Sequence, residues 1–290
     1  MRVLLFGPGG QIGAEIMRLA GGEAIPVPRG VCDLVQPGAA RAMIERADCD
    51  VVVNAAGYTA VDKAESEREA AEAVNAAAPG EMAEACAARG LPFIQVSTDY
   101  VFDGEAARPY VETDRTAPLN VYGATKLDGE RRVAAAGGAS VVLRTSWVFS
   151  SHGTNFVKTM LRLGRERSSV RVVGDQRGKP TPAAGVAEAS LTVARALQGD
   201  PSKAGLYHYA GDEATTWADF AAAIFARAKV STAVERITTA EYPSAARRPL
   251  YSVLDTVKFE RTFGLAAPSW RAGLDQVLDE LARDEKDPRR

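Results

Sequence analysis

Residues 120–126 read Asn-Val-Tyr-Gly-Ala-Thr-Lys, which places Tyr122 four residues before Lys126. Four residues make about one helical turn, so on a helix both side chains leave the same face. A phenol normally keeps its proton to about pH 10. An ammonium group close by favours the phenolate and lowers the pKa of the phenol. The spacing therefore predicts that Tyr122 serves as an acid and base, provided that the rest of the chain builds a site around it.

A glycine turn near the N-terminus is the first element that such a site needs. Residues 2–6 read as a buried strand, and an apolar helical pattern begins after Gly13. Strand, glycine turn and helix form the phosphate-binding unit of a dinucleotide fold, because glycines let backbone N–H groups approach a pyrophosphate. The spacing of Gly7, Gly10 and Gly13 differs from the G-x-G-x-x-G fingerprint. An ordinary turn between a strand and a helix is the alternative.

The next three predicted strands also end in residues that suit a ligand. The strand at 24–27 leads to Arg29, and an arginine there suits the 2′-phosphate of NADPH, although a solvated loop arginine is nearly as good an interpretation. The strand at 50–54 ends in the small residues Ala55, Ala56 and Gly57, which let the backbone lie against a cofactor. The strand at 91–96 ends at Ser97 and Thr98. Ligands bind at the carboxyl ends of parallel strands, so we expect these residues to share one cleft.

The whole chain reads as an α/β protein with a doubly wound parallel (Rossmann) sheet and a smaller mixed α/β C-terminal lobe. We expect the dinucleotide-binding domain over 1–150 and a mainly substrate-binding lobe over 151–290, with some segments of 151–290 returning to the first domain. Residues 63–89 read as helical, broken around Pro79-Gly80. Further helices are predicted at 122–136, 155–167, 183–197, 217–228 and 270–282. The polar tail over 284–290 should fray.

Composition excludes several classes of function. With 290 residues, 46% of them hydrophobic, the chain can bury a large core. A net charge of −2 gives no reason to expect nucleic acid or an anionic membrane as a partner. We see no signal peptide and no apolar run long enough to span a bilayer, so we expect a cytoplasmic protein. Three cysteines without ligand spacing and two histidines make a Cys/His zinc site improbable.

Several segments carry a resemblance to a known family. The glycine turn with Tyr-x-x-x-Lys is typical of extended short-chain dehydrogenases/reductases, and the chain is more specifically similar to the dTDP-4-dehydrorhamnose reductases over residues 1 to about 275. The segments that carry this similarity are Leu-Leu-Phe-Gly at 4–7, Gly-Gln-Ile-Gly at 10–13, Val-Asn-Ala-Ala at 53–56, Thr-Ala-Val-Asp-Lys-Ala-Glu at 59–65, Ser-Thr-Asp-Tyr-Val-Phe at 97–102, Pro-Leu-Asn-Val-Tyr-Gly at 118–123, Arg-Thr-Ser-Trp at 144–147, Asn-Phe at 155–156 and Gly-Leu-Tyr-His at 205–208.

The resemblance implies reduction of dTDP-4-dehydro-β-L-rhamnose to dTDP-L-rhamnose with NADPH or NADH, in the biosynthesis of dTDP-rhamnose for cell-surface polysaccharide. Tyr122 would be the proton donor, Thr98 would orient the carbonyl oxygen and Lys126 would hold the ribose. The implied cofactor contacts are Gly10, Gln11, Ile12, Asp33, Leu34, Ala55, Ala56, Gly57, Tyr122 and Lys126. The implied contacts to the dTDP-sugar are Thr98, Asp99, Tyr122, Trp147 and Asn155, with Arg248 a candidate for the diphosphate or else a surface arginine.

The sequence departs from the family pattern in two places. Some members bind magnesium through carboxylates at a dimer contact. Glu15 fits the first part of that pattern, but 183–185 reads Ala-Ala-Gly and the next acid is Glu188. Mg²⁺ therefore stays uncertain, and we expect a monomer or a weak homodimer. Arg29 replaces the acid of some relatives, which favours NADPH over NADH.

Two other functions remain open. A nucleotide-sugar epimerase of the same superfamily would keep its cofactor through turnover, whereas a reductase consumes it. A non-catalytic NADP-binding regulatory subunit would not need Tyr122, Lys126 and Thr98. A 4,6-dehydratase usually needs an Asp-Glu pair after the threonine, but here Asp99 is followed by Tyr100. Elimination of water is therefore the less suitable chemistry.

Overall fold

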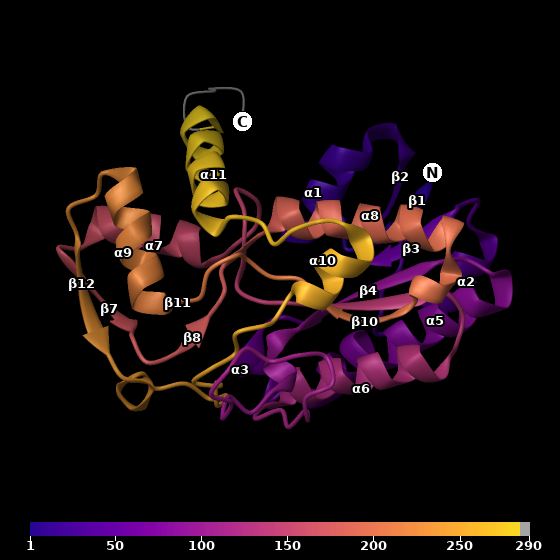
Figure 1. Ribbon diagram of the computed structural model, residues 1–290, viewed down its shortest axis with the longest axis horizontal. Coiled ribbons are helices and arrows are strands. Elements are labelled where there is room, and N and C mark those ends of the chain that lie inside the picture. Colours follow the sequence, from indigo (N-terminus) through magenta and orange to yellow (C-terminus); the bar gives the residue numbers. More distant parts are fainter. Residues whose placement is uncertain (285–290) are drawn as a thin grey trace.

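A six-stranded parallel sheet forms the centre of the larger lobe of the computed structural model, which describes residues 1–284 (Figure 1). The strand order is β10-β5-β4-β3-β1-β2. The strands are β1 (Val3–Phe6), β2 (Ala24–Val27), β3 (Val51–Asn54), β4 (Phe93–Thr98), β5 (Ser140–Thr145) and β10 (Gly205–His208). The connections turn to opposite sides of β1, so the topological switch point, where such sheets bind ligands, lies between β1 and β3. The predicted doubly wound sheet is confirmed.

Helices cover both faces of this sheet (Figure 1). On one face, α1, α8 and α10 pack on the strands through a cluster that includes Ile16 and Phe259. On the other, α2, α5 and α6 pack through a cluster that includes Ile44 and Met82. The helices of this lobe are α1 (Gln11–Ala20), α2 (Ala39–Arg46), α3 (Val61–Ala64), α4 (Arg68–Glu72), α5 (Ala78–Arg89), α6 (Val121–Ala135), α8 (Ala183–Gly199) and α10 (Val257–Phe263). Burial on both faces explains why the central strands are continuous apolar runs.

A smaller lobe lies beside the sheet and has its own core. This core includes Phe149, Phe220 and Trp270. Its elements are β6 (Val148–Phe149), α7 (Phe156–Glu166), β7 (Ser169–Val173), β8 (Arg177–Gly178), β9 (Thr181–Pro182), β11 (Thr215–Thr216), α9 (Trp217–Ala228), β12 (Ala233–Ile237) and α11 (Trp270–Asp284). Three segments from the second half of the chain, α8, β10 and α10, pack in the larger lobe instead. The domain limits of 1–150 and 151–290 remain a prediction.

The helical region before β4 is broken at a different place from the one predicted. The break lies between α3 and α4, whereas a π-helical segment, Ala73–Ala77, joins α4 to α5 without interruption and α5 runs through Pro79 and Gly80. Pro79 stands just after the junction of the π-helical segment with α5, where the hydrogen-bonding pattern of the helix changes. Gly80 serves helix packing, since a Cβ there would lie 3.0 Å from the Cβ of Arg132 on α6.

Most other boundaries lie within two residues of the predicted ones. Strand β4 continues to Thr98, so the two hydroxyl residues predicted to follow the strand end it instead. The Gly/Pro-rich segment at 174–182 contains the short strands β8 and β9. The polar tail predicted to fray lies outside the described residues, apart from Asp284 at the end of α11.

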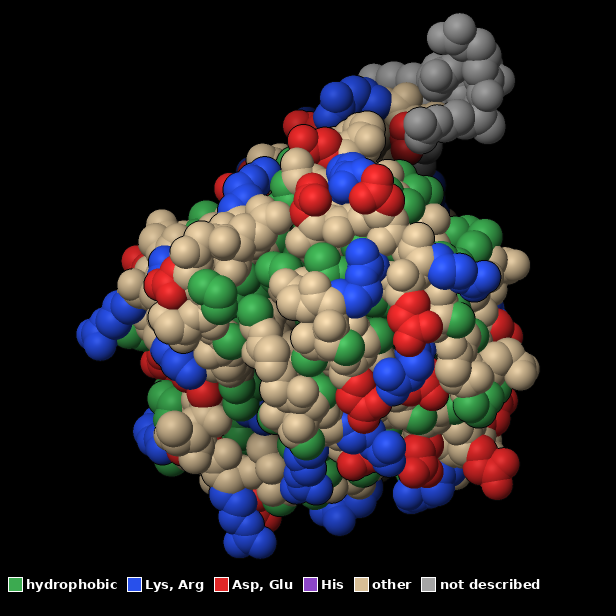
Figure 2. Space-filling model, turned by 90° about the vertical axis from the view of Figure 1, so that its right-hand side faces the viewer, with side chains coloured by type: hydrophobic (Ala, Val, Ile, Leu, Met, Phe, Trp, Pro, Cys, Tyr) green, Lys and Arg blue, Asp and Glu red, His purple; other side chains and the backbone are tan. Residues whose placement is uncertain are grey.

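The surface carries both signs of charge. Figure 2 shows the end of the molecule that lies to the right in Figure 1, where acidic and basic side chains alternate over short distances. Such mixing fits the small net charge of −2. Within residues 1–284, none of the helices has the length and apolar character that crossing a membrane requires.

Candidate active site

A cavity of about 800 Å³ opens at the carboxyl ends of β1, β3, β4 and β5 and reaches the start of α9 in the smaller lobe. It gathers most of the residues that the sequence singles out. The predicted residues that line it are Gly7, Gly10, Gln11, Ile12, Arg29, Asp33, Leu34, Ala55, Ala56, Gly57, Thr98, Asp99, Tyr122, Lys126 and Trp147. The four predicted residues that do not line it are Gly13, Glu15, Asn155 and Arg248. The strand ends thus form one cleft, as the parallel-sheet rule predicts.

The glycine turn is packed so closely that side chains would not fit at two of its positions. Gly7 has a φ of 78°, and a Cβ there would lie 2.6 Å from the backbone N of Ala56. A Cβ at Gly13 would lie 2.0 Å from the carbonyl oxygen of Gly7. Gly13 therefore acts behind the cavity wall, where it lets α1 approach β1. The first-turn N–H groups of α1, which have no partner within the helix, are left at the cavity. This cradle fits the pyrophosphate of a dinucleotide.

Arg29 and Asp33 follow β2, the edge strand of the sheet, and would lie near the adenosine part of a cofactor. The Arg29 side chain is 81% exposed, and its Nε lies 3.5 Å from Oδ1 of Asp33. Both residues line the cavity. An exposed guanidinium held loosely at the cavity edge is free to turn toward a phosphate group. The geometry is therefore compatible with the preference for NADPH that Arg29 suggests.

Helix α6 positions Tyr122 and Lys126. The Asn120 side chain caps the helix by accepting a hydrogen bond from the backbone N of Gly123, at 2.8 Å. Gly123 also allows close approach to the end of β4, because a Cβ there would lie 2.1 Å from the carbonyl oxygen of Tyr100. The Nζ of Lys126 is buried and donates to the carbonyl oxygen of Val96 at 2.6 Å. The helix is thereby fixed with its tyrosine and its lysine in the cavity.

The protonation of this pair differs from the expectation drawn from spacing. Burial raises the pKa of Tyr122 to about 12, the carboxylate of Asp99 acts in the same direction, and the side-chain contact with Thr98 opposes it. Burial lowers the pKa of Lys126 to about 8. The pKa of Tyr122 is therefore raised and not lowered as the spacing predicts, because desolvation of the phenol is the largest effect on it. At neutral pH Tyr122 holds its proton and is suited to donate it.

Thr98 and Asp99 form a buried polar pair beside Tyr122. The hydroxyl of Thr98 donates to Oδ1 of Asp99 at 3.2 Å. Oδ2 of Asp99 is buried without a hydrogen-bond partner among residues 1–284. Burial raises the pKa of Asp99 to about 7, and the side chains of Ser252 and Thr98 act in the opposite direction. A buried carboxyl with a raised pKa therefore lies directly against the hydroxyl of Thr98 at the cavity wall.

Two stacked indoles form the wall of the cavity toward the smaller lobe. The rings of Trp147 and Trp217 lie 3.6 Å apart and are nearly parallel, at 10°. Trp147 has a φ of 47°, which is strained for a residue with a side chain. A Cβ at Gly178 would lie 2.5 Å from the ring of Trp147, so glycine is required there. Trp217 was not predicted as a site residue from the sequence. The sequence identifies this residue only as the start of a helix, about 70 residues after Trp147.

The other predicted residues outside the cavity have partners of their own. Arg248 makes a bidentate ion pair with Asp62, at 2.7 and 3.2 Å. Glu15 is buried and pairs with Nε of Arg18 at 2.8 Å and with Nε2 of His152 at 3.4 Å. In the described part of the chain, no three His, Cys, Asp or Glu side chains gather where they could hold a metal ion. Nothing in this geometry supports Glu15 as a magnesium ligand.

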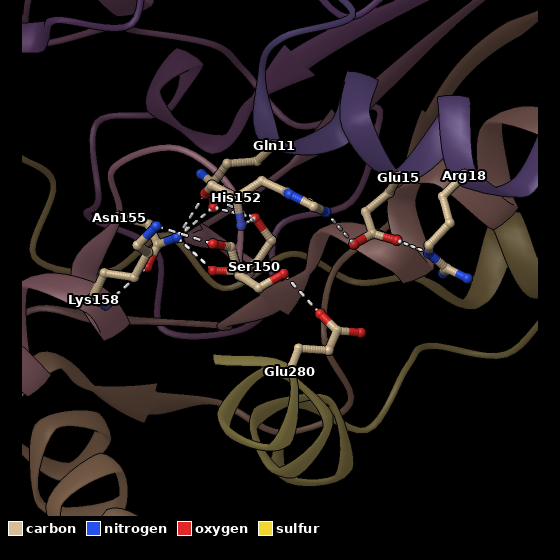
Figure 3. A network of polar contacts seen from close by, with 9 residues as sticks. Gln11, Glu15, Arg18, Ser150, His152, Asn155, Lys158 and Glu280 are labelled. Atoms are coloured by element: carbon tan, nitrogen blue, oxygen red, sulfur yellow. Dashed lines mark hydrogen bonds and ion pairs between the residues drawn. The ribbon is translucent and has the colours of Figure 1, made fainter. Parts of the chain in front are cut away.

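Asn155, predicted to contact the sugar, lies at the N-terminus of α7. Its Oδ1 accepts a hydrogen bond from the backbone N of Lys158 at 3.1 Å, and its Nδ2 donates to Oε1 of Gln11 at 2.9 Å (Figure 3). The side chain is 9% exposed. Asn155 therefore contacts a residue of the glycine turn instead of lining the cavity itself.

Comparison with known proteins gives one consistent result. The family model described as RmlD substrate binding domain matches residues 1–283. The dTDP-4-dehydrorhamnose reductase of Burkholderia thailandensis is 44% identical over 295 residues, which cover 97% of this chain and 99% of that protein. That of Shigella flexneri is 42% identical over 293 residues, covering 97% and 98%.

Solved structures agree with these relatives. The chain resembles the dTDP-4-dehydrorhamnose reductase of Clostridium acetobutylicum with a TM-score of 0.91 and 36% identity, over 97% of this chain and 100% of that one. It resembles the enzyme of Bacillus anthracis, solved in complex with NADP, with a TM-score of 0.90 and 33% identity, over 96% and 99%.

Proposed function

The chain belongs to the dTDP-4-dehydrorhamnose reductase family, and on that basis we propose that it reduces the 4-keto group of dTDP-4-dehydro-β-L-rhamnose to give dTDP-L-rhamnose, with NADPH as cofactor. The observation that carries the proposal is a protonated, buried Tyr122 beside Thr98 in the cavity that also contains the glycine cradle. An acid next to a dinucleotide site is what reduction of a ketone requires.

The residues of the cradle fit the cofactor. The first-turn N–H groups of α1 would bind the pyrophosphate, and Ala55 to Gly57 would let the nicotinamide half lie close to the backbone. Arg29 would bind a 2′-phosphate, which favours NADPH over NADH. When bound, NADPH supplies a hydride to the carbonyl carbon. The remaining tasks, positioning the ketone and supplying a proton, belong to the chain itself.

Proton transfer falls to Tyr122. Its pKa of about 12 keeps the phenol protonated at neutral pH, so it can give its proton to the oxygen as negative charge develops there. Thr98 would hold the same oxygen by a hydrogen bond. Lys126, on the same face of α6 one turn later, would stabilise the tyrosinate that remains and hold the ribose.

The sugar would bind between Asp99 and the indole of Trp147. Asp99 lines the cavity beside the hydroxyl of Thr98, so it would lie next to the sugar. Trp147 and Trp217 would supply apolar area against the ring. The placement of Arg248 in an ion pair with Asp62 lends no support to its proposed contact with the diphosphate.

The test is product formation coupled to cofactor consumption. The purified protein is given NADPH and the product of the preceding dehydratase and epimerase reactions, while the absorbance of reduced nicotinamide is followed and the sugar is identified by NMR. We expect one NADPH consumed per dTDP-L-rhamnose formed. Product without net NADPH consumption would instead indicate an epimerase, and a talo-configured product would indicate delivery to the opposite face.

Tyr122→Phe tests the proton donor directly, because it removes the hydroxyl and keeps the ring. Turnover should fall about 100-fold or more, since the general acid is lost, whereas the dissociation constant of NADPH should change little. Full turnover in this variant would refute the role of Tyr122 as proton donor.

A further inference from the structure

The amide of Gln11 is held by β6 and by the segment that leads from β6 into α7. Oε1 of Gln11 accepts hydrogen bonds from Oγ of Ser150 at 3.1 Å and from Nδ2 of Asn155 at 2.9 Å. Its Nε2 donates to the carbonyl oxygen of Val148 at 3.2 Å. Figure 3 shows Gln11 reaching from the start of α1 toward Ser150 and Asn155. The hydrogen-bonding atoms of this side chain are therefore directed to the other lobe of the protein.

The same loop forms part of the cavity wall. Gly153 and Thr154 line the cavity together with Gly10, Gln11 and Ile12 of the glycine turn. Gly153 has a φ of 61°, and a Cβ there would lie 3.7 Å from Cγ of Gln11. Loop and turn are thus two walls of one corner of the cavity, at the N-terminus of α1 where a phosphate group would bind. The bonds from Asn155 and Ser150 to Gln11 fix the separation of these walls.

Other contacts fasten the loop to the protein without involving Gln11. Oγ of Ser151 donates to Oε2 of Glu280 on α11 at 2.7 Å, and Nζ of Lys158 donates to the carbonyl oxygen of Ser151 at 3.0 Å. Figure 3 shows Glu280 approaching the loop from α11, on the side away from Gln11. The loop therefore has anchors that can be removed separately from its link to the glycine turn.

We infer that Asn155 is a positioning residue for the cofactor, which acts through Gln11 to hold the glycine turn and the 150–155 loop at the separation that fits a dinucleotide pyrophosphate. Oδ1 of Asn155 caps α7, and its Nδ2 donates to Gln11 and also, within the loop, to the carbonyl oxygens of Ser150 and His152, at 2.7 and 3.3 Å. The inference rests on the proposed function in taking NADPH as the cofactor. It replaces a direct contact between Asn155 and the sugar.

Asn155→Ser keeps the helix cap and removes the amide bonds to Gln11 and to the loop. Serine is a good N-cap residue and is uncharged, but its hydroxyl is too short to reach Gln11 in place of the amide. The dissociation constant of NADPH, measured by fluorescence titration without sugar, should rise about tenfold. The KM for the sugar should change less than twofold. Ser150→Ala, which removes the other donor to Gln11, should raise the dissociation constant about threefold and serves if the first variant folds poorly.

A double-mutant cycle distinguishes action through Gln11 from a general loosening of the loop. Gln11→Met, which keeps the length of the side chain without its amide, should raise the dissociation constant of NADPH about tenfold. Combined with Asn155→Ser it should raise the dissociation constant by less than the product of the two single effects, because both changes remove the bond between Gln11 and Asn155. Ser151→Ala, which breaks only the contact with Glu280, should leave NADPH binding within twofold of the parent protein.

Three results would overturn the inference. Multiplicative effects of the Gln11 and Asn155 variants would mean that they act separately. An increase in the sugar KM with unchanged NADPH binding would return Asn155 to the substrate site. An effect of Ser151→Ala equal to that of Asn155→Ser would mean that any loosening of the loop suffices. NADPH binding is measured without sugar, so the two proposals can fail separately. Failure to reduce the sugar would refute the proposed function, whereas the expected result of the double-mutant cycle would still support the role of Asn155.

Discussion

Asp99→Asn offers a direct test of the electrostatics of the cavity. Asp99 is 2% exposed, and its Oδ2 lacks a hydrogen-bond partner within residues 1–284. Burial raises the pKa of this carboxyl from the ordinary 3.8 to about 7. Asparagine has nearly the same shape and does not titrate. The exchange therefore removes the ionisation while it leaves the packing of the cavity wall almost unchanged.

The sign of the effect follows from the raised pKa. Between pH 4 and pH 7 the folded protein keeps a proton on Asp99 that the unfolded chain releases, so the free energy of unfolding falls as the pH rises through this range. Above pH 7 both states are ionised and the loss is complete. A shift of about 3 pKa units corresponds to about 4 kcal/mol, which is an upper value for a fully desolvated group. The parent protein should show this loss between pH 4 and pH 8, whereas the variant should lack it.

Urea unfolding of both proteins at four pH values from 5 to 8 measures the difference. All other titrating groups are shared, so they cancel in the difference between the two curves. We expect the asparagine variant to gain stability relative to the parent protein as the pH rises, by up to about 3 kcal/mol over this range. Thr125→Val on α6 is the control, because it changes a buried uncharged group and its effect should not vary with pH. Parallel curves for the parent protein and Asp99→Asn would refute a raised pKa for Asp99.

Three further substitutions test other parts of the structure. Gly13→Ala places a Cβ 2.0 Å from the carbonyl oxygen of Gly7, so the glycine turn must shift. The dissociation constant of NADPH, measured by titration, should rise at least tenfold. Unchanged binding would contradict the close packing of the turn. Glu130→Gln leaves the buried guanidinium of Arg144 without its carboxylate and should cost about 3–5 kcal/mol in urea unfolding, whereas a cost below 1 kcal/mol would contradict the burial of the pair. Trp217→Ala removes one of two stacked indoles and should raise the sugar KM in initial-rate measurements about tenfold, with NADPH binding as the unaffected control.

The sequence was a good guide wherever local pattern decides the structure. Strands buried on both faces are continuous apolar runs, and residues 3–6 and 51–53 show this pattern plainly. Once the strands are placed, the parallel-sheet rule brings their carboxyl ends together without further information. That is why the glycine turn, Ala55 to Gly57, Thr98 and Tyr122 could be assigned to one cleft in advance. The family resemblance was confirmed by relatives over nearly the whole chain.

The parts that could not be predicted depend on contacts between distant segments. Trp217 joins the cavity because its ring stacks on that of Trp147, and no local pattern around residue 217 indicates this contact. Asn155 contacts Gln11, which lies 144 residues away in the chain. The break expected at Pro79 is absent because the helix continues through the proline from a π-helical segment, which no local pattern indicates.

The protonation of Tyr122 also depends on burial, which spacing does not reveal, and it bears on the direction of the reaction. Reduction begins from a protonated phenol, whereas oxidation of the product alcohol needs the tyrosinate as a base. With a pKa of about 12, the tyrosinate is only about one part in 10⁵ at pH 7. The carboxylate of Asp99 adds to this bias, because a negative charge nearby opposes a second one on the phenol. The cavity therefore favours delivery of a proton over its removal, which is the protonation state that a ketone reductase requires at the start of each turnover.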